Sequence, residues 1–403
     1  GTGNDLSRVL GWGSTAPFKK PAKDAERLRA LVARWLEAHS VPMDVWDVTV
    51  STHPGGSFAF VQKDGSLALT QEEKSQRHVR VDAAGCQSLT RSFVNYFSLG
   101  AISQIGIAFD RQRTKSRLKN MLVYAKEGAY KAMNYKTTIE LGSIAEKLTD
   151  GDTCVFGTDS TIEEEDKPSG DMVSLIFLNI PSMAGGSDIW GRSTAVSVKR
   201  ARQFLDWRQD FGDGWLELMT YGSVNDFLRE KMGPALHGNG QRLHTGSGPF
   251  ALQLRDASQP PPDDNRSSVF ARYSRSTKKT GGKLFMQADG EFFAVQEPAA
   301  VEVAWSRSML VLRAPRHAVD DTVAEIFDDG VRMLHFLEFL VSKGERDAAI
   351  AAYTAGLVRS STATSEIAEV ADMVVGEVLQ GPVLMMYLEH PDGWRAMRQG
   401  HCL

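Results

Sequence analysis

The middle of the chain alternates apolar and polar residues in the manner of β-strands. Residues 41–50 carry this alternation, with Val41 and Val45 on one side and Trp46 and Val50 on the other. Gly, Asp, Asn and Pro separate further apolar segments, and many short strands between turns favour a sandwich or a barrel. These further predicted strands are 58–61, 91–99, 153–157, 173–181, 250–254, 284–287, 292–296 and 301–305.

Helical patterns lie before, within and after this β-rich stretch. Apolar residues recur at helical spacing over 24–39, and a shorter helix follows a cap at Asn4 or Asp5. Helical inserts are predicted at 116–134 and 197–210. The fold class expected is therefore α+β. After residue 315 the composition changes, and the helix-like segments there are 319–343, 346–358 and 364–380.

Composition narrows the possible functions. The 46 Lys and Arg residues against 50 Asp and Glu give a formal net charge of −4, which argues against a nucleic-acid partner. A hydrophobic content of 42% with 24% charged residues is ordinary for a globular protein of two or three domains. The three cysteines lie far apart and form no zinc or disulfide pattern, which favours a reducing, cytoplasmic location. No apolar run is long enough to span a bilayer.

The first residue is Gly1 rather than Met. We expect the chain to be an excised piece, or one whose true start is missing. It opens on Gly1-Thr2-Gly3-Asn4-Asp5, a turn that can aim backbone N–H groups at an anion. The hydroxyl of Thr2 can bind a phosphate oxygen, and Asn4 and Asp5 can orient a nucleotide or a metal-bound water. A plain glycine turn with a helix cap explains the same residues.

Four later blocks give this turn a context. They are Asn-Tyr-Phe-Ser-Leu-Gly (95–100), Asn-Ile-Pro-Ser-Met-Ala-Gly-Gly-Ser-Asp-Ile-Trp-Gly (179–191), Asp-Phe-Gly-Asp-Gly-Trp-Leu-Glu-Leu (210–218) and Met-Gln-Ala-Asp-Gly-Glu (286–291). In this order the five blocks resemble the eukaryotic diacylglycerol kinase family. The resemblance covers roughly residues 1–12, 88–130 and 173–313.

The resemblance implies a fold and an activity. Members of the family transfer the γ-phosphoryl group of ATP to the hydroxyl of diacylglycerol, which gives phosphatidate. They combine an α/β nucleotide-binding domain with a β-rich accessory domain, and the active site lies between the two. Residues 1–50 would then be part of the nucleotide-binding domain, 51–315 a β-sandwich-like accessory domain with loop insertions, and 316–403 a helical C-terminal tail.

The resemblance also assigns roles to residues. Asp5 and Glu291 would be catalytic, and the cofactors would be ATP and Mg²⁺. Asp289 and Glu291 lie in a tight turn that would face the nucleotide and its Mg²⁺, because carboxylates suit that ion. The expected nucleotide-binding residues are Gly1, Thr2, Gly3, Asn4 and Asp289.

A second Mg²⁺ site, of structural character, is implied at Asp210, Asp213 and the backbone carbonyl of Trp215. The two aspartates explain a turn equally well. For the block 179–191 we favour a loop-shaping role over a catalytic one. The five basic residues between 111 and 119 are read as a solvated face, with anionic lipid or phosphate as the alternative.

Two features depart from the family pattern. The family carries Gly-Gly-Asp-Gly-Thr upstream of the first block, and the Asp of that segment is the leading candidate for the general base; no such segment occurs here. The family usually has Asp two residues after the Gly of the 95–100 block, where this chain has Ile102. An apolar side chain neither binds a metal nor accepts a proton. The 403-residue chain by itself is therefore expected to be inactive.

The function that the sequence favours is that of an ATP-dependent diacylglycerol kinase in lipid signalling. It would work in the cytoplasm and associate peripherally with a membrane surface, where its substrate lies. Two alternatives stay open. One is a sphingosine or ceramide kinase, which shares the nucleotide motif, and the other is a catalytically degenerate module that binds lipid or nucleotide.

Overall fold

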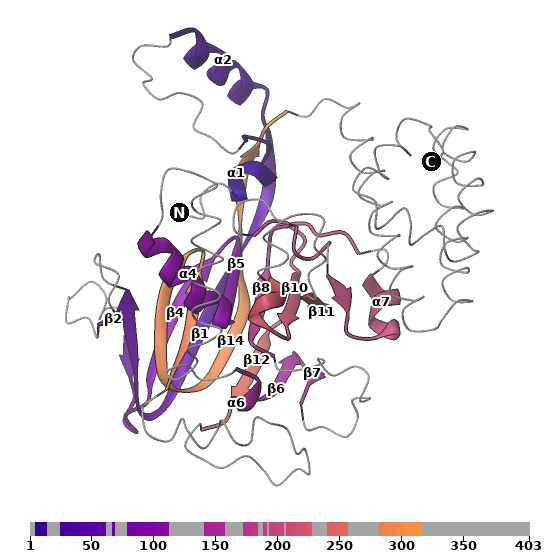
Figure 1. Cartoon of the computed structure of the whole chain (residues 1–403). Helices are drawn as coiled ribbons and strands as arrows, with labels where there is room; N and C mark the ends of the chain where they lie inside the picture. Colours follow the sequence, from indigo (N-terminus) through magenta and orange to yellow (C-terminus); the bar gives the residue numbers. More distant parts are fainter. Residues whose placement is uncertain are drawn as a thin grey trace. The chain divides into compact units, whose positions relative to one another are not determined.

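The computed structural model describes residues 5–13, 25–61, 67–68, 79–112, 141–157, 172–183, 188–191, 193–204, 207–227, 240–256 and 282–315 (Figure 1). All of them belong to the first of two compact units, Gly1–Asp321. The predicted elements at 116–134 and after residue 315, and the nucleotide-binding residues Gly1 to Asn4, lie outside the described ranges.

Strands dominate the described part of the chain. They are β1 (His39–Val61), β2 (Leu67–Ala68), β3 (Val79–Val81), β4 (Gln87–Phe93), β5 (Tyr96–Gly100), β6 (Ala145–Asp150), β7 (Thr153–Phe156), β8 (Ser174–Leu178), β9 (Thr194–Ala195), β10 (Leu216–Tyr221), β11 (Gly240–Gly246), β12 (Phe250–Leu254), β13 (Lys283–Ala288) and β14 (Glu291–Arg313). The helices are α1 (Asp5–Val9), α2 (Ala25–Leu36), α4 (Ala101–Gln112), α6 (Leu141–Ile144) and α7 (Val198–Phe204). This mostly antiparallel sheet with few helices agrees with the α+β class.

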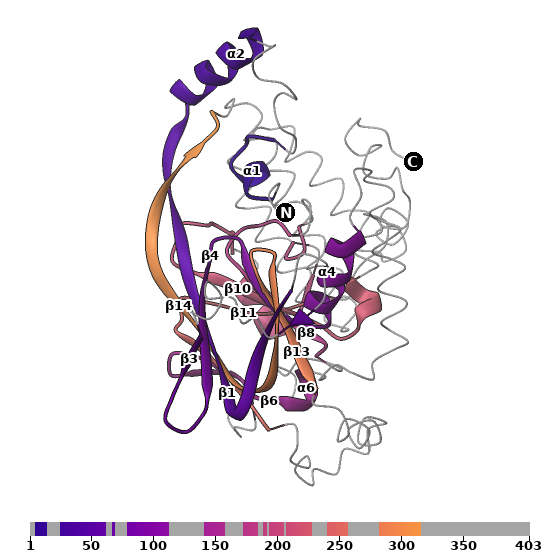
Figure 2. The ribbon, with the colours of Figure 1, turned by 90° about the vertical axis from the view of Figure 1, so that its left-hand side faces the viewer.

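One long strand pair organises the sheet. β1 and β14 pair antiparallel from His39 with Arg313 to Phe60 with Phe293 (Figure 2). The other edge of β14 changes partner along its length, since it pairs with β13 up to Gln296 and with β12 from Ala300 to Val303. Between these partners Glu297 has a φ of 48° and Pro298 has no N–H to donate, so the ladder is interrupted where the sheet branches.

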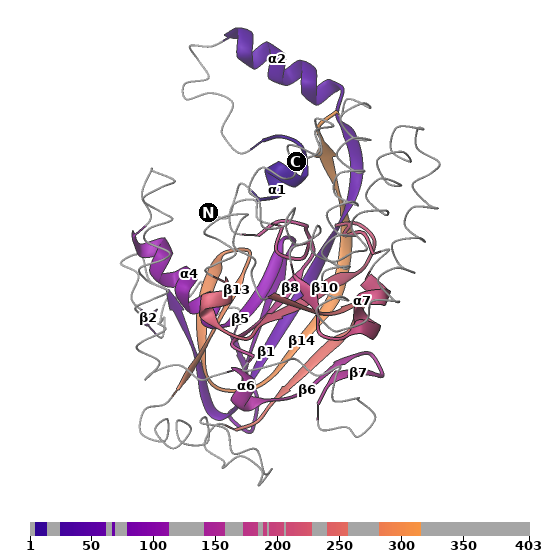
Figure 3. The same cartoon turned by 45° about the vertical axis from the view of Figure 1, so that its right-hand side comes forward.

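The two branches carry most of the other strands, while β4, followed by β3, and the short β2 pair with β1. One continues from β13 through β5, β8, β10 and β11 to β9, and the other runs from β12 through β6 to β7. The helix α4 contacts β13 and β5 (Figure 3). Apart from the short parallel pair of β9 and β11, all strand pairs among the described residues are antiparallel.

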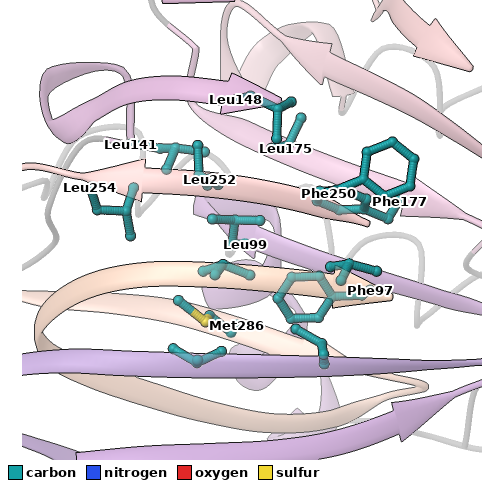
Figure 4. Packing of buried hydrophobic residues seen from close by; sticks show 14 of the residues in the cluster. Phe97, Leu99, Leu141, Leu148, Leu175, Phe177, Phe250, Leu252, Leu254 and Met286 are labelled. Atoms are coloured by element: carbon teal, nitrogen blue, oxygen red, sulfur yellow. The ribbon is translucent and has the colours of Figure 1, made fainter. Parts of the chain in front are cut away.

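A hydrophobic core lies where the branches face each other (Figure 4). Phe177 of β8 contacts Phe97 of β5 and Phe250 of β12, with ring centroids 5.9 Å and 5.6 Å apart. The pair with Phe250 is edge-to-face, a geometry that aromatic rings prefer. Leu99, Leu252 and Met286 complete this part of the core. Strands from both branches of one sheet thus contribute to this core.

Several predicted strands differ in extent from the observed ones. The segments 41–50 and 58–61 both belong to β1, and 292–296 and 301–305 both belong to β14. The predicted strand 91–99 is divided into β4 and β5, because Val94 and Asn95 form a turn. The domain boundary expected after residue 50 falls inside β1, which pairs with β14 on both sides of that residue.

Some elements gave no clear signal in the sequence. The strands β6, β10 and β11 and the helix α4 were not predicted. β10 is buried along its whole length, so both of its faces are covered and the period-two alternation is absent. None of the helices in the described ranges has the length and apolar character that a membrane crossing requires.

Candidate functional site

Asp5 joins three of the sequence blocks at one buried carboxylate. The residue begins α1 and is fully buried. Its Oδ1 accepts a hydrogen bond from the hydroxyl of Ser182 at 3.0 Å. Its Oδ2 accepts one from the hydroxyl of Tyr96 at 3.4 Å. Residues that are 91 and 177 positions away in the chain therefore meet the end of the first block.

The helix α1 is fastened to the far end of β14. The indole N–H of Trp12 donates to the carbonyl of Leu312 at 2.7 Å, and the N–H of Ala314 donates to the carbonyl of Leu10 at 2.8 Å. Gly11 has a φ of 76°, which favours glycine because a side chain there is strained. These contacts fix the orientation in which Asp5 enters the site.

Asp289 holds the turn between β4 and β5. Its Oδ2 accepts the N–H of Val94 at 2.8 Å, and its Oδ1 accepts those of Asn95 at 2.8 Å and Tyr96 at 3.1 Å. Its own N–H donates to the carbonyl of Tyr96 at 3.1 Å. Burial raises the pKa of Asp289, and the three N–H donors oppose that rise. Both carboxylate oxygens are thus engaged with backbone groups, so the structure shows Asp289 as a clamp on this turn.

Glu291 differs from Asp289 although it is only two residues away. Asp289 and Gly290 form the turn from β13 to β14 with φ values of 49° and 83°, as a tight hairpin requires. Glu291 opens β14 opposite Ala288, and its side chain is exposed. Of the two predicted carboxylates in this turn, Glu291 is therefore the exposed one, whereas Asp289 is only partly exposed.

Asn179, just after β8, also hydrogen-bonds to the turn between β4 and β5. Its Nδ2 donates to the carbonyls of Val94 at 2.7 Å and Asp44 at 3.1 Å, and its Oδ1 accepts the indole N–H of Trp46 at 3.0 Å. Its N–H donates to the carbonyl of Asn95 at 2.9 Å. These bonds agree with the loop-shaping role expected for this block.

The predicted metal residues form a turn before β10. Oδ1 of Asp210 accepts the N–H of Gly212 at 3.2 Å, and Oδ1 of Asp213 accepts that of Trp215 at 2.9 Å. Asp44 is buried beside them, where its Oδ2 accepts the N–H of Gly214 at 2.7 Å. Partial burial raises the pKa of Asp213 to about 6, and the negative charges of Asp210 and Asp44 add to the rise.

This concentration of negative charge is what a cation would relieve, so the donor set suits Mg²⁺ in chemical character. The structure nevertheless explains each carboxylate as a partner of its own turn. In the described ranges no three His, Cys, Asp or Glu side chains gather as a metal site. The predicted Mg²⁺ site has only two such side chains, and its third ligand is a backbone carbonyl. It therefore stays a prediction.

Sequence reasoning missed Glu217. This residue of β10 is buried, and its carboxyl accepts hydrogen bonds from Nε1 of Trp207 at 2.8 Å and Nε2 of Gln209 at 3.0 Å. Burial raises its pKa to about 8, so the carboxyl carries its proton at neutral pH. The rings of Trp207 and Trp215 lie 4.9 Å apart beside it. The available signal was a charged residue inside an apolar run, at Leu216-Glu217-Leu218.

Ile102 occupies the position where the family usually has Asp. It is buried in the first turn of α4, and its N–H donates to the hydroxyl of Ser174 at 2.9 Å. An ionised carboxylate at this place would need a compensating partner. The departure seen in the sequence therefore corresponds to an apolar, packed position.

Comparison with known proteins identifies the β-rich part of the chain. Residues 92–292 match the model of the diacylglycerol kinase accessory domain. The chain is 28% identical over 249 residues to probable diacylglycerol kinase 3 of Caenorhabditis elegans, an alignment of 58% of this chain and 26% of that protein. It is 25% identical over 221 residues to diacylglycerol kinase 1 of Oryza sativa subsp. japonica, covering 47% of this chain and 39% of the relative.

Diacylglycerol kinase theta of Homo sapiens is 24% identical over 230 residues, which cover 56% of this chain and 19% of that protein. The chain thus spans well under half the length of these relatives. Tyr96, Asn179, Ser182 and Asp289, which meet around one turn and at Asp5, all lie in the matched segment. From the domain match, the relatives and this convergence we conclude that the chain belongs to the eukaryotic diacylglycerol kinase family.

Proposed function

We propose that the whole protein is an ATP-dependent diacylglycerol kinase that produces phosphatidate. The observation that supports this most is the junction at Asp5, which ties the end of the predicted phosphate-binding turn to Tyr96 and Ser182 of the accessory domain. Phosphoryl transfer depends mainly on positioning and on the stabilisation of charge. A junction that fixes the turn against the accessory domain serves that requirement.

We assign the following roles to the residues of the chain. Gly1, Thr2, Gly3 and Asn4 would bind the phosphates, and Asp5 would hold this turn in register through its two hydroxyl donors. Glu291 is exposed next to the clamped turn and would approach the reacting groups. When bound, ATP supplies the phosphoryl group and Mg²⁺ neutralises charge on it. Asp210, Asp213 and the carbonyl of Trp215 would hold a structural Mg²⁺.

Diacylglycerol lies in membranes, so the protein would work in the cytoplasm at a membrane surface. Residues 1–50 would belong to its nucleotide-binding domain, 51–315 to the accessory domain and 316–403 to a helical segment. The relatives carry the name diacylglycerol kinase, which does not favour a sphingosine or ceramide kinase. The apolar Ile102 is the observation that favours a degenerate binding module instead.

The test uses the full-length protein with ATP and Mg²⁺ in mixed micelles that contain diacylglycerol, sphingosine or ceramide. We expect phosphorylation of diacylglycerol with clear preference over the other two lipids. A preference for sphingosine or ceramide would contradict the proposal. Binding of ATP and lipid without turnover by a folded sample would support the degenerate module.

A further inference from the structure

Asn95 has an unused acceptor at the centre of the site. The residue is only 7% exposed, and its side-chain Oδ1 is buried without a hydrogen-bond partner. The backbone of Asn95 is fully engaged, since its N–H donates to Asp289 and its carbonyl accepts the N–H of Asn179. The unmet group is therefore the side-chain oxygen alone.

The orientation of the Asn95 amide follows from its surroundings. The interaction of its side-chain amide with Asp289 lowers the pKa of that carboxyl against the rise that burial causes. A carboxylate accepts hydrogen bonds, so the NH₂ end must face Asp289 and the oxygen must point elsewhere. Turning the amide over would place its oxygen against the carboxylate. The free acceptor is thus a consequence of the clamp.

Most buried polar atoms in folded proteins have a partner, and an unmet one calls for an explanation. The neighbouring Asn179 shows that this region can satisfy an amide, because its Oδ1 and Nδ2 both have partners. The backbone N–H of Asn95 donates to Asp289, and the next residue, Tyr96, donates its hydroxyl to Asp5. A donor that arrives with a substrate would complete its bonding.

We propose that Oδ1 of Asn95 accepts a hydrogen bond from an alcohol group of a bound substrate. The inference rests on the proposed kinase function. Ionised phosphate oxygens and ester carbonyls only accept hydrogen bonds, so they cannot serve this atom. The alcohols of the two substrates are the primary hydroxyl of diacylglycerol and the ribose hydroxyls of ATP. Asn95 would thus be a substrate-binding residue that accepts from a hydroxyl. The amino group of adenine is the other donor of ATP, but every nucleotide compared below retains it, so it cannot account for a preference between them.

The experiment compares each alcohol with an analogue that lacks it, in the full-length protein. The lipid pair is dioctanoylglycerol and its 3-deoxy analogue, and the nucleotide pairs are ATP with 2′-deoxy-ATP and with 3′-deoxy-ATP. Binding is measured by calorimetry for the wild type, for Asn95→Leu and for the control Ser98→Ala. Ser98 is buried on the adjoining β5, but its hydroxyl has partners in Ser103 and Gln287.

We expect the wild type to prefer one alcohol over its deoxy analogue by roughly tenfold or more, and Asn95→Leu to lose that preference. The preference is the ratio of two affinities measured on the same variant, so a general loss of binding caused by the substitution cancels out of it. The control Ser98→Ala should keep the preference. Loss in the lipid pair identifies the diacylglycerol hydroxyl, and loss in a nucleotide pair identifies the ribose. If Asn95→Leu keeps every preference of the wild type, or the wild type has none, the inference is wrong.

The two proposals fail differently. A wild type that phosphorylates diacylglycerol while Asn95→Leu retains all discrimination overturns only the role of Asn95. A wild type that neither binds nor phosphorylates diacylglycerol overturns both proposals.

Discussion

Asp5 illustrates how one residue can connect distant parts of the chain. An ionised carboxylate can only accept hydrogen bonds, and that of Asp5 accepts them from the hydroxyls of Ser182 and Tyr96. A hydrogen bond to a charged group contributes about 1.5–3 kcal/mol to stability, because the alternative is a buried and unsolvated charge.

We predict that Asp5→Asn lowers the free energy of unfolding by about 1–3 kcal/mol, since the NH₂ group of the new amide faces a hydroxyl that had donated. Denaturant unfolding of the full-length protein measures this. Ser182→Ala and the double variant complete a mutant cycle with a coupling of about 1 kcal/mol. Strictly additive losses would show that the Ser182 bond contributes nothing.

Glu217 makes stability depend on pH. Its pKa rises from 4.5 to about 8 on folding, because burial disfavours the charged form. The folded state therefore binds the proton more tightly than the unfolded state. We predict that the free energy of unfolding falls as the pH rises from 4.5 to about 8, by up to roughly 1.4 kcal/mol per pH unit.

Urea unfolding across that pH range checks the prediction, with Glu217→Gln as the matched variant. The neutral amide should flatten the slope in the upper half of the range. Asp213, whose pKa is raised to about 6, contributes mainly in the lower part of the range and serves as the internal comparison. An unchanged slope in Glu217→Gln would contradict the assignment.

At the level of elements, the site is a contact between two turns. The β13–β14 hairpin presents Asp289, and the β4–β5 turn presents the three N–H groups that it accepts. Asn179, just after β8, donates a further hydrogen bond to the β4–β5 turn, at the carbonyl of Val94. A single carboxylate thus aligns two pairs of strands whose residues are almost 200 positions apart.

We predict that Asp289→Ala lowers the free energy of unfolding by about 3 kcal/mol or more and strongly reduces kinase activity. It removes three hydrogen bonds and places Ala at a φ of 49°. Asp289→Asn separates the two effects, since Asn tolerates positive φ and keeps one acceptor oxygen. We expect its loss of stability to be intermediate. Equal losses in both variants would mean that the backbone conformation contributes nothing.

At the scale of the whole described unit, the branched sheet folds around a shared core. Phe177 contacts both Phe97 and Phe250, so one ring links strands of the two branches. Leu310 is also apolar, but it lies near the far end of β14 and is 74% exposed. Both residues are apolar, but only the buried Phe177 is expected to contribute strongly to the free energy of unfolding.

We predict that Phe177→Ala lowers the free energy of unfolding by about 3–5 kcal/mol, as expected for a large buried aromatic side chain. Leu310→Ala should change it by no more than about 0.5 kcal/mol. Calorimetric melting of both variants tests this. A comparable loss in the two would show that the branches do not share one core.

The sequence allowed a correct prediction of many elements and of the family. The alternation over 41–50 lies in β1, and the strong apolar run at 173–181 contains β8. The completely buried β10 was missed because it has no exposed face. Among site residues, Asp5 was singled out as catalytic, and that role stays a prediction, whereas the buried Glu217 and the clamp made by Asp289 were not predicted.

The sequence by itself determined the α+β class, the set of motif residues and the resemblance to a lipid kinase. These depend on side-chain type and local spacing, which a chain shows directly. The tertiary structure decided which polar groups are satisfied. Asp289 is engaged by three N–H groups, whereas Oδ1 of Asn95 is left without a partner. Every residue except proline carries a backbone N–H, so only the path of the chain determines which of them meets a given carboxylate.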